Sequence, residues 1–130
     1  MTAVRAHGVD FVEVARIAEM IEKHGDRFLE RCFTPGERAY AEGRKRRDEH
    51  LAARFAAKEA ALKAIGTGWR SGIAWTDVEV VVAPSGAPSL VLTGVAADIA
   101  RNLGLSELLV SLSHAGGFAM ASVIGVGDGN

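Results

Sequence analysis

The residues best able to do chemistry in this sequence are Glu59 and Lys63, one helical turn apart in the segment 54–68, RFAAKEAALKAIGTG. Apart from Lys58, the residues around them are almost all apolar, and a helix that is apolar all round is normally buried. A buried carboxylate is costly unless a cation or hydrogen-bond donors compensate its charge, so Glu59 requires a partner. The simplest partner is Lys63 at i+4, in a bridge that contributes about 0.2 to 0.5 kcal/mol.

The triplet Gly66-Thr67-Gly68 follows this helical pattern. A glycine there can adopt the left-handed conformation that ends a helix, and a second glycine leaves backbone N–H groups open to a phosphate. A plain C-cap followed by a turn explains such a triplet more often. Because the triplet lies beside Lys63, an anion-binding site there is the alternative.

Asp10 is a second acidic candidate, where a short predicted strand meets a predicted helix. As an N-cap it would form a capping box with Glu13. If Asp10 instead converges with Glu59, the pair supplies hard oxygen ligands suited to Mg²⁺, which takes its other ligands from water and substrate phosphates. The local sequence leaves both roles open.

Ser113 and His114 end a strand that reads VSLSH and is followed by glycines. We expect the imidazole at the mouth of a sheet, where it can contact a phosphate. A structural histidine, with serines that face solvent by strand alternation, is the alternative.

The densest basic run is Gly-Arg-Lys-Arg-Arg at 43–47. Such clusters bind nucleic acid, a localisation receptor or a phosphate group, or are simply solvated surface. Asp48 and Glu49 follow at once and no aromatic residues interleave, which disfavours nucleic acid and leaves a single phosphate clamp open.

The elements that position these residues are typical of one α+β domain spanning residues 1–130, with a core large enough to need no disulfide. Thr34, Pro35 and Glu37 predict a capped helix start. Strands are expected at 3–9, 77–83, 89–93, 108–113 and 118–126, and helices at 14–24, 28–33, from 35, at 48–65 and at 95–103.

Composition narrows the class of protein. The 15 basic and 16 acidic residues give a net charge of −1, which indicates an ordinary soluble globule without general affinity for nucleic acid. Cys32 is the only cysteine, which excludes an intrachain disulfide and fits a reducing compartment, so we expect a cytoplasmic protein. No targeting signal or membrane-length apolar run is evident.

Three segments occur in a fixed order: GVDFVEVARI at 8–17, RFAAKEAALKAIGTG at 54–68 and SLSHAGGFAMASVI at 111–124. In combination they closely resemble the bacterial holo-acyl-carrier-protein synthases, the small phosphopantetheinyl transferases, over nearly the full chain. The resemblance implies a homotrimer of α+β protomers, each with a long Ala-rich helix packed on antiparallel hairpins. It places the active sites between neighbouring protomers.

The resemblance also implies the reaction, a transfer of 4'-phosphopantetheine from coenzyme A to a serine of apo acyl carrier protein. Adenosine 3',5'-bisphosphate is released, and fatty acid synthesis is the default pathway, with polyketide carriers equally compatible. By motif, Asp10 and Glu59 would bind Mg²⁺ or Mn²⁺. Lys63 and His114 would stabilise charge on the leaving phosphate, and either Glu59 or a metal-bound water would accept the serine proton.

Contacts to coenzyme A are carried over in the same way. A 3'-phosphate clamp is expected from Lys45, Arg46 and Arg54. Other expected contacts are Lys63, Gly66, Thr67, Gly68, Ser113 and His114.

The expected partner surface is cationic. Arg16, Lys23 and Arg27 predict a basic first helix that would suit the acidic recognition helix of an acyl carrier protein, although ordinary surface charge is the alternative. Where family members often read Gly-x-Gly, this chain has Ala6-His7-Gly8, so His7 is expected near Asp10 and to influence metal affinity or pH response.

Two competing functions remain compatible with the sequence. One is a metal-dependent hydrolase of coenzyme A or another nucleotide. The other is a noncatalytic module that binds a carrier protein or nucleic acid through the cationic segments.

Overall fold

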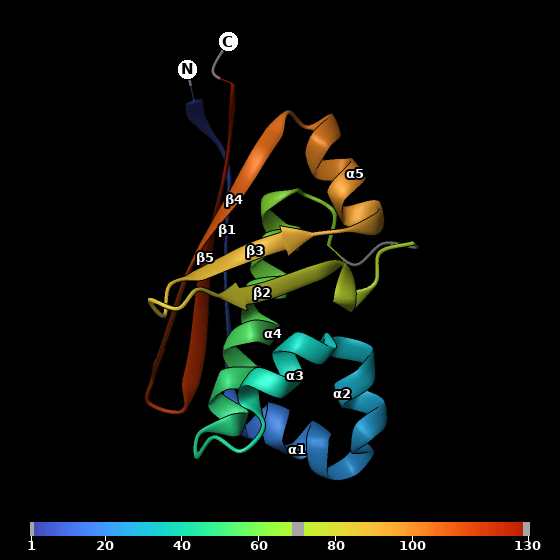
Figure 1. Cartoon of the computed structure of the whole chain (residues 1–130), viewed down its shortest axis with the longest axis vertical. Helices are drawn as coiled ribbons and strands as arrows, with labels where there is room; N and C mark the ends of the chain where they lie inside the picture. Colours follow the sequence, from blue (N-terminus) through green and yellow to red (C-terminus); the bar gives the residue numbers. More distant parts are fainter. Residues whose placement is uncertain (1, 69–71, 129–130) are drawn as a thin grey trace.

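The long helix α4 (Arg47–Ala64) is the element around which the chain is organised, as Figure 1 shows. The computed structural model describes residues 2–68 and 72–128. The strands are β1 (Thr2–Glu13), β2 (Val78–Val82), β3 (Pro88–Leu92), β4 (Leu105–Ala115) and β5 (Phe118–Asp128). The other helices are α1 (Val14–His24), α2 (Asp26–Cys32), α3 (Pro35–Ala41) and α5 (Gly94–Asn102), with a 3₁₀ turn η1 (Trp75–Asp77).

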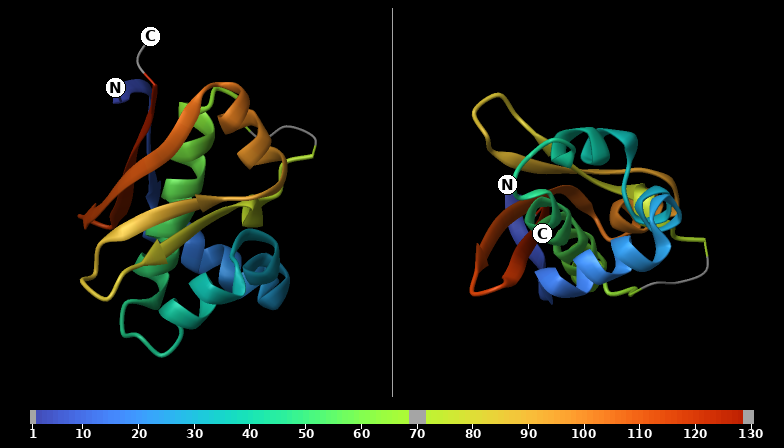
Figure 2. Two further views of the ribbon diagram at one scale, coloured as in Figure 1. Left: turned by 45° about the horizontal axis from the view of Figure 1, so that its top comes forward. Right: turned by 90° about the horizontal axis from the view of Figure 1, so that it is seen from below.

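Three strands form an antiparallel sheet in the order β1-β5-β4, and β2 and β3 form a separate hairpin. α4 packs on one face of the sheet, mainly against β1 and β5, and the hairpin lies beside β4 (Figures 1 and 2). In both figures α1, α2 and α3 gather near the beginning of α4, whereas α5 lies toward its other end. None of the described helices combines the length and apolarity needed to cross a membrane.

The sequence of α4 explains its central place. Every residue from Leu51 to Leu62 is buried except Glu59, and half of these residues are alanines at 52, 53, 56, 57, 60 and 61. Alanine has the highest helix propensity, and its short side chain lets neighbouring backbones approach closely. The buried apolar side chains form a cluster around this helix.

The predicted α+β class is confirmed, as are both hairpins and the helix boundaries to within a few residues. The Thr34 capping box is also confirmed, since the Thr34 hydroxyl accepts from the Glu37 N–H and the Glu37 carboxylate accepts from the Thr34 N–H. The N-cap role of Asp10 is wrong: β1 continues to Glu13, and Asp10 lies inside it opposite Ala121 of β5. Continuous pairing with β5 extends the strand beyond the range expected from local pattern.

Candidate active site

Asp10 reaches α4 because β1 crosses the helix at a position where only glycine fits. A Cβ added to Gly8 would lie 2.1 Å from the carbonyl oxygen of Ala60 and 2.7 Å from the N atom of Ala64. Since strand side chains alternate between faces, Asp10 lies on the same face of β1 as Gly8. The strand therefore presents the Asp10 carboxylate directly to the last turns of α4.

Lys63 is the helix residue that meets this carboxylate. Its Nζ lies 2.9 Å from Oδ1 of Asp10 and also donates to the carbonyl oxygen of Val9 at 3.2 Å. Lys63 is exposed, whereas the Asp10 side chain retains 21% of its exposure. The ammonium is thus held by strand β1 and remains open to a ligand.

Glu59, one turn earlier on α4, belongs to the same charge cluster. The hydrogen bond and charge of Asp10 raise the pKa of Lys63 above its ordinary value, and the charge of Glu59 raises it further. The charges of both carboxylates therefore act on the same ammonium. Glu59 is partly exposed while its neighbours are buried, so this carboxylate faces outward from the core.

The triplet after α4 forms a helix cap. The N–H of Gly66 donates to the carbonyl oxygen of Lys63 and the N–H of Thr67 donates to that of Leu62, both at 3.1 Å. Gly66 has φ +76°, the left-handed conformation expected of a C-cap glycine. These two N–H groups already have partners, which supports the C-cap interpretation of the triplet. Among the residues that the structure describes, a Cβ on Gly66 or Gly68 would meet no atom within 4 Å.

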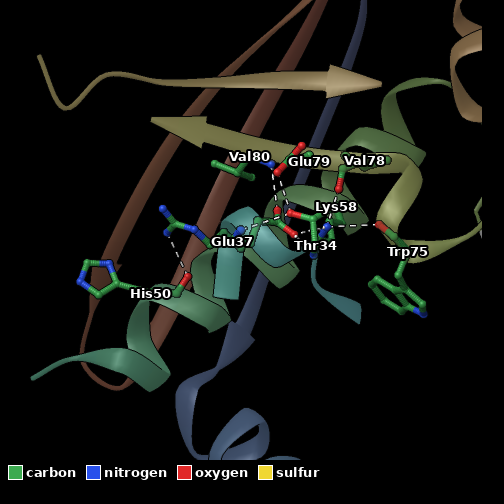
Figure 3. Close-up of polar contacts among 9 residues, drawn as sticks. Thr34, Glu37, His50, Lys58, Trp75, Val78, Glu79 and Val80 are labelled. Carbon is green, nitrogen blue, oxygen red and sulfur yellow. Dashed lines mark hydrogen bonds and ion pairs between the residues drawn. The ribbon is translucent and has the colours of Figure 1, made fainter. Parts of the chain in front are cut away.

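The fully buried charge on α4 is Lys58, which the sequence did not single out for burial. Its Nζ lies 2.8 Å from Oε1 of Glu37 and donates to the carbonyl oxygens of Trp75 and Val78 (Figure 3). Oε2 of Glu37 accepts from the N–H of Val80 at 2.8 Å. This pair joins α3, α4 and the β2–β3 hairpin, so its role is to set how these elements pack.

His114 lies at the opposite end of α4 from Lys63. Its Nδ1 is 3.9 Å from Oε2 of Glu49, close to the start of the helix. At about 1.5 Å per residue, Lys63 lies roughly 21 Å from Glu49 along the same helix. Within one protomer, therefore, His114 is not brought to Lys63 and Glu59.

The expected phosphate-clamp residues group near His114. Lys45 and Arg46 are exposed in the turn before α4, where Arg46 Nε lies 3.6 Å from Oε2 of Glu49. Arg54 is only 2% exposed and lines a cavity of about 280 Å³ that His114 and Glu49 also border. Oε2 of Glu49 and Nε of Arg54 are buried without a hydrogen-bond partner. Glu49 was not predicted to belong to this group, because in the sequence it merely ends a charged run.

The structure also gives the positions of Ser113 and His7. Ser113 is exposed and, by strand alternation, points to the opposite face of β4 from His114. His7 lies on the opposite face of β1 from Asp10 and contacts the hydroxyl of Ser122 at 3.2 Å. The expected proximity of the His7 and Asp10 side chains is therefore wrong within one chain, because successive side chains of a strand point to alternate faces and these two residues are an odd number of positions apart.

The cationic surface is divided between two helices. Arg16 and Lys23 are exposed on α1, and Lys23 is bridged to Glu19 at 2.7 Å. Arg27 is exposed too but belongs to α2, because Gly25, with φ +53°, ends the first helix. The three charges therefore do not form a single first-helix surface.

The carboxylates suit a divalent cation that a substrate also ligates. Asp10 and Glu59 offer hard oxygen donors, and no group of three or more potential His, Cys, Asp or Glu ligands occurs within 2–68 and 72–128. Such a pair leaves most of an octahedral coordination shell to water and substrate oxygens, as Mg²⁺ prefers in phosphate chemistry. The chemistry of the donors thus fits a magnesium ion shared with a phosphorylated substrate.

Comparison with known proteins identifies relatives over almost the whole chain. Residues 6–121 match the family model described as the 4'-phosphopantetheinyl transferase superfamily. The holo-[acyl-carrier-protein] synthase of Solibacter usitatus is 51% identical over 117 residues, which are 90% of this chain and 94% of that protein.

Two solved structures extend the comparison to ligand complexes. The Helicobacter pylori holo-[acyl-carrier-protein] synthase in complex with coenzyme A has a TM-score of 0.81 and 29% identity, covering 92% of this chain and 98% of that one. The Bacillus anthracis holo-(acyl-carrier-protein) synthase in complex with coenzyme A (3',5'-ADP) has a TM-score of 0.78 and 35% identity, covering 96% and 98%.

Proposed function

The chain belongs to the 4'-phosphopantetheinyl transferase superfamily, and we propose that Asp10, Glu59 and Lys63 form the centre at which its reaction occurs. It is a holo-[acyl-carrier-protein] synthase that transfers 4'-phosphopantetheine from coenzyme A to a serine of apo acyl carrier protein. Adenosine 3',5'-bisphosphate is the second product. The carrier serves fatty acid biosynthesis, and the same chemistry suits a polyketide carrier.

One observation carries the assignment of the centre: two carboxylates from different elements act on the ammonium of Lys63 at the Gly8 crossing. Asp10 and Glu59 would hold Mg²⁺, or Mn²⁺ in its place, together with the pyrophosphate of coenzyme A. When bound, the metal would neutralise the negative charge of the pyrophosphate.

The residues of the chain have distinct proposed roles in the transfer. The carrier serine oxygen forms a bond to the phosphorus next to pantetheine, and the bond from that phosphorus to the bridging pyrophosphate oxygen breaks. Glu59 accepts the serine proton, and Lys63 stabilises negative charge on the leaving phosphate. Phosphoryl transfer depends mainly on such positioning and charge stabilisation, so no covalent enzyme intermediate is needed.

The remaining coenzyme A contacts lie at both ends of α4. Gly66, Thr67 and Gly68 are proposed to contact the coenzyme next to Lys63, where a Cβ on either glycine would meet none of the described residues within 4 Å. At the other end, the 3'-phosphate is clamped by Lys45, Arg46 and Arg54, of which Arg54 lines the cavity of about 280 Å³. His114, which also lines this cavity, stabilises charge on the leaving phosphate, and Ser113 is a further proposed coenzyme A contact on the other face of β4.

We propose a homotrimer whose active sites lie between protomers. Glu49, which lies beside His114, is roughly 21 Å from Lys63 along α4. A coenzyme A molecule that contacts both Lys63 and His114 would do so most simply across a subunit boundary. The sheet face turned away from α4 supports this arrangement, since its exposed apolar side chains need cover. These side chains include Val9, Phe11, Leu109, Phe118 and Met120.

The carrier protein is proposed to dock through Arg16 and Lys23 on α1 and Arg27 on α2, where charge complementarity speeds encounter with an acidic helix.

A cytoplasmic location is proposed from Cys32. It is buried, and burial raises the pKa of its thiol to about 11, so it stays protonated and suits a reducing compartment.

Intact-protein mass spectrometry tests the function directly. An apo acyl carrier protein is incubated with this chain and coenzyme A, with Mg²⁺ or with a chelator. A phosphopantetheine adduct that requires the metal is expected. Nucleotide release without an adduct on any carrier would instead indicate a coenzyme A hydrolase.

A further inference from the structure

Arg54 is a buried cation that has the carboxylates of Glu37 and Glu49 in its surroundings but no carboxylate in direct contact, among the residues the structure describes. Its guanidinium donates to the carbonyl oxygen of His50 at 3.1 Å, while its Nε has no hydrogen-bond partner. In the part of the chain that the structure describes, Arg54 takes part in no ion pair within 4.0 Å. A buried charge of this kind is stable only if an anion or oriented groups compensate it.

Tyr40 supplies the contact that holds this side chain. The Cζ atom of Arg54 lies 4.3 Å from the centroid of the Tyr40 ring, and the Cζ atom of Arg44 lies 4.0 Å from the same centroid. The His50 ring meets Tyr40 edge-on, with centroids 5.5 Å apart. A ring face attracts a guanidinium most strongly where water is excluded, so the half-buried Tyr40 fixes the position of Arg54.

This arrangement concentrates positive charge beside a space that can accept a ligand. Tyr40, His50 and Arg54 line the cavity of about 280 Å³ together with His114. The cavity also has one acidic residue, Glu49, but its Oε2 lies 3.6 Å from Nε of Arg46 and so already faces another cation. Two guanidinium groups drawn to one ring repel each other, and an anion placed between or beside them relieves that repulsion. A phosphate monoester is the anion whose oxygens match guanidinium donors best.

We propose that Tyr40 is a positioning residue that holds Arg54, with Arg44 on the same ring, for the 3'-phosphate monoester of coenzyme A. Tyr40 thereby sets the preference for coenzyme A over 3'-dephospho-coenzyme A. The inference rests on the proposed function, because it requires coenzyme A to occupy this cavity. The sequence did not single out Tyr40, whereas Arg44 belongs to the basic run at 43–47 for which a phosphate clamp was left open.

The test compares Tyr40→Leu, which removes the ring, with Tyr40→Phe, which keeps it. The KM and kcat for coenzyme A and for 3'-dephospho-coenzyme A are measured with the same apo acyl carrier protein. For Tyr40→Leu we expect the KM for coenzyme A to rise about tenfold, the KM for the dephospho form to change less than twofold, and kcat to be kept. Tyr40→Phe keeps the ring and loses only the hydroxyl and its hydrogen bond with Arg54, so it should retain most of the preference of the unaltered chain.

A purely structural role of Tyr40 gives a different result. Partial unfolding lowers the active fraction for both substrates alike and leaves their ratio unchanged, so an unchanged ratio in Tyr40→Leu overturns the inference. If that variant does not fold, Arg44→Gln replaces it, since Arg44 is exposed, and an unchanged ratio there has the same meaning. If the unaltered chain transfers phosphopantetheine but shows no preference, the 3'-phosphate clamp fails; if it transfers none, the proposed function fails.

Discussion

Asp10 is the residue for which two cations compete. In the structure its Oδ1 accepts from Lys63, and in the proposed reaction it also holds the metal ion. An ammonium and a divalent cation near one carboxylate repel each other, so in the proposed site Lys63 would weaken metal binding to the free enzyme while it stabilises charge in the transition state. The opposing effects can be measured separately.

Lys63→Met should therefore bind Mn²⁺ more tightly in the absence of coenzyme A, yet show a kcat lower by on the order of 10² to 10³. Mn²⁺ titration followed by electron paramagnetic resonance gives the first quantity, and single-turnover transfer gives the second. Arg101→Gln is the matched control, because Arg101 is an exposed cation paired with Asp98 on α5. Weaker Mn²⁺ binding in Lys63→Met would contradict competition for Asp10.

His50 makes the stability of the chain depend on pH. Burial lowers its pKa below the ordinary value, and the positive charges of Arg54 and Arg44 lower it further. The unfolded chain then binds more protons than the folded chain just below pH 6.5, so stability falls as the pH falls through the unfolded pKa. The stability due to neutral His50 is fully present above that pH.

We expect His50→Gln to flatten this dependence. Urea unfolding at a series of pH values between about 5 and 8 should show a smaller loss of stability below pH 6.5 in the variant. An unchanged slope would mean that other groups account for the acid sensitivity.

At the scale of elements, the pair Lys58–Glu37 determines how α3, α4 and the β2–β3 hairpin fit together. Both side chains are fully buried, and Glu37 also accepts from the backbone N–H groups of Thr34 and Val80. Removing one partner of a buried pair leaves the other charge without compensation. Since α4 carries Glu59 and Lys63, any shift in its packing would also move the proposed centre.

Lys58→Met should lower the free energy of unfolding by about 3 to 5 kcal/mol, because it leaves the Glu37 carboxylate buried and unpaired. The double variant Lys58→Met/Glu37→Gln should recover part of this loss, since glutamine can still accept from one backbone N–H. Urea denaturation of both variants measures the difference. Equal stability of the single and double variants would show that the Glu37 charge is not what the loss reflects.

Local pattern predicted most elements, because the signals are themselves local. The apolar spacing of α1 and the Thr34 capping box act over a few residues, and both were confirmed. The long-range features were not accessible from pattern. In the sequence, Lys58 and Glu59 both look like single charges on an apolar helix. The burial of Lys58 depends on its ion pair with Glu37, which belongs to another helix. The motif resemblance singled out Asp10 and Glu59, but only the packing of Gly8 against α4 shows how β1 brings Asp10 to Lys63.

At the scale of the whole molecule, the residues of the proposed site form two groups that are far apart within one protomer. Glu59 and Lys63 lie near the end of α4, and His114 lies near its start, so one protomer does not bring them together. The apolar face of the β1-β5-β4 sheet gives a second copy a place to pack. Phe11 and Phe118 on adjacent strands contact each other there, with ring centroids 5.9 Å apart.

Mixing two impaired variants distinguishes a shared site from one contained in a single protomer. Glu59→Gln and His114→Ala should each lose most of their activity as separate homotrimers. If each site takes Glu59 from one protomer and His114 from its neighbour, random trimers from an equal mixture regain about a quarter of intact sites. Refolding the two variants together and separately, with the oligomeric state checked by light scattering, gives the comparison. Activity that never exceeds the sum of the separate samples would place both halves within one protomer, and the roughly 21 Å between them would then have to be spanned by coenzyme A alone.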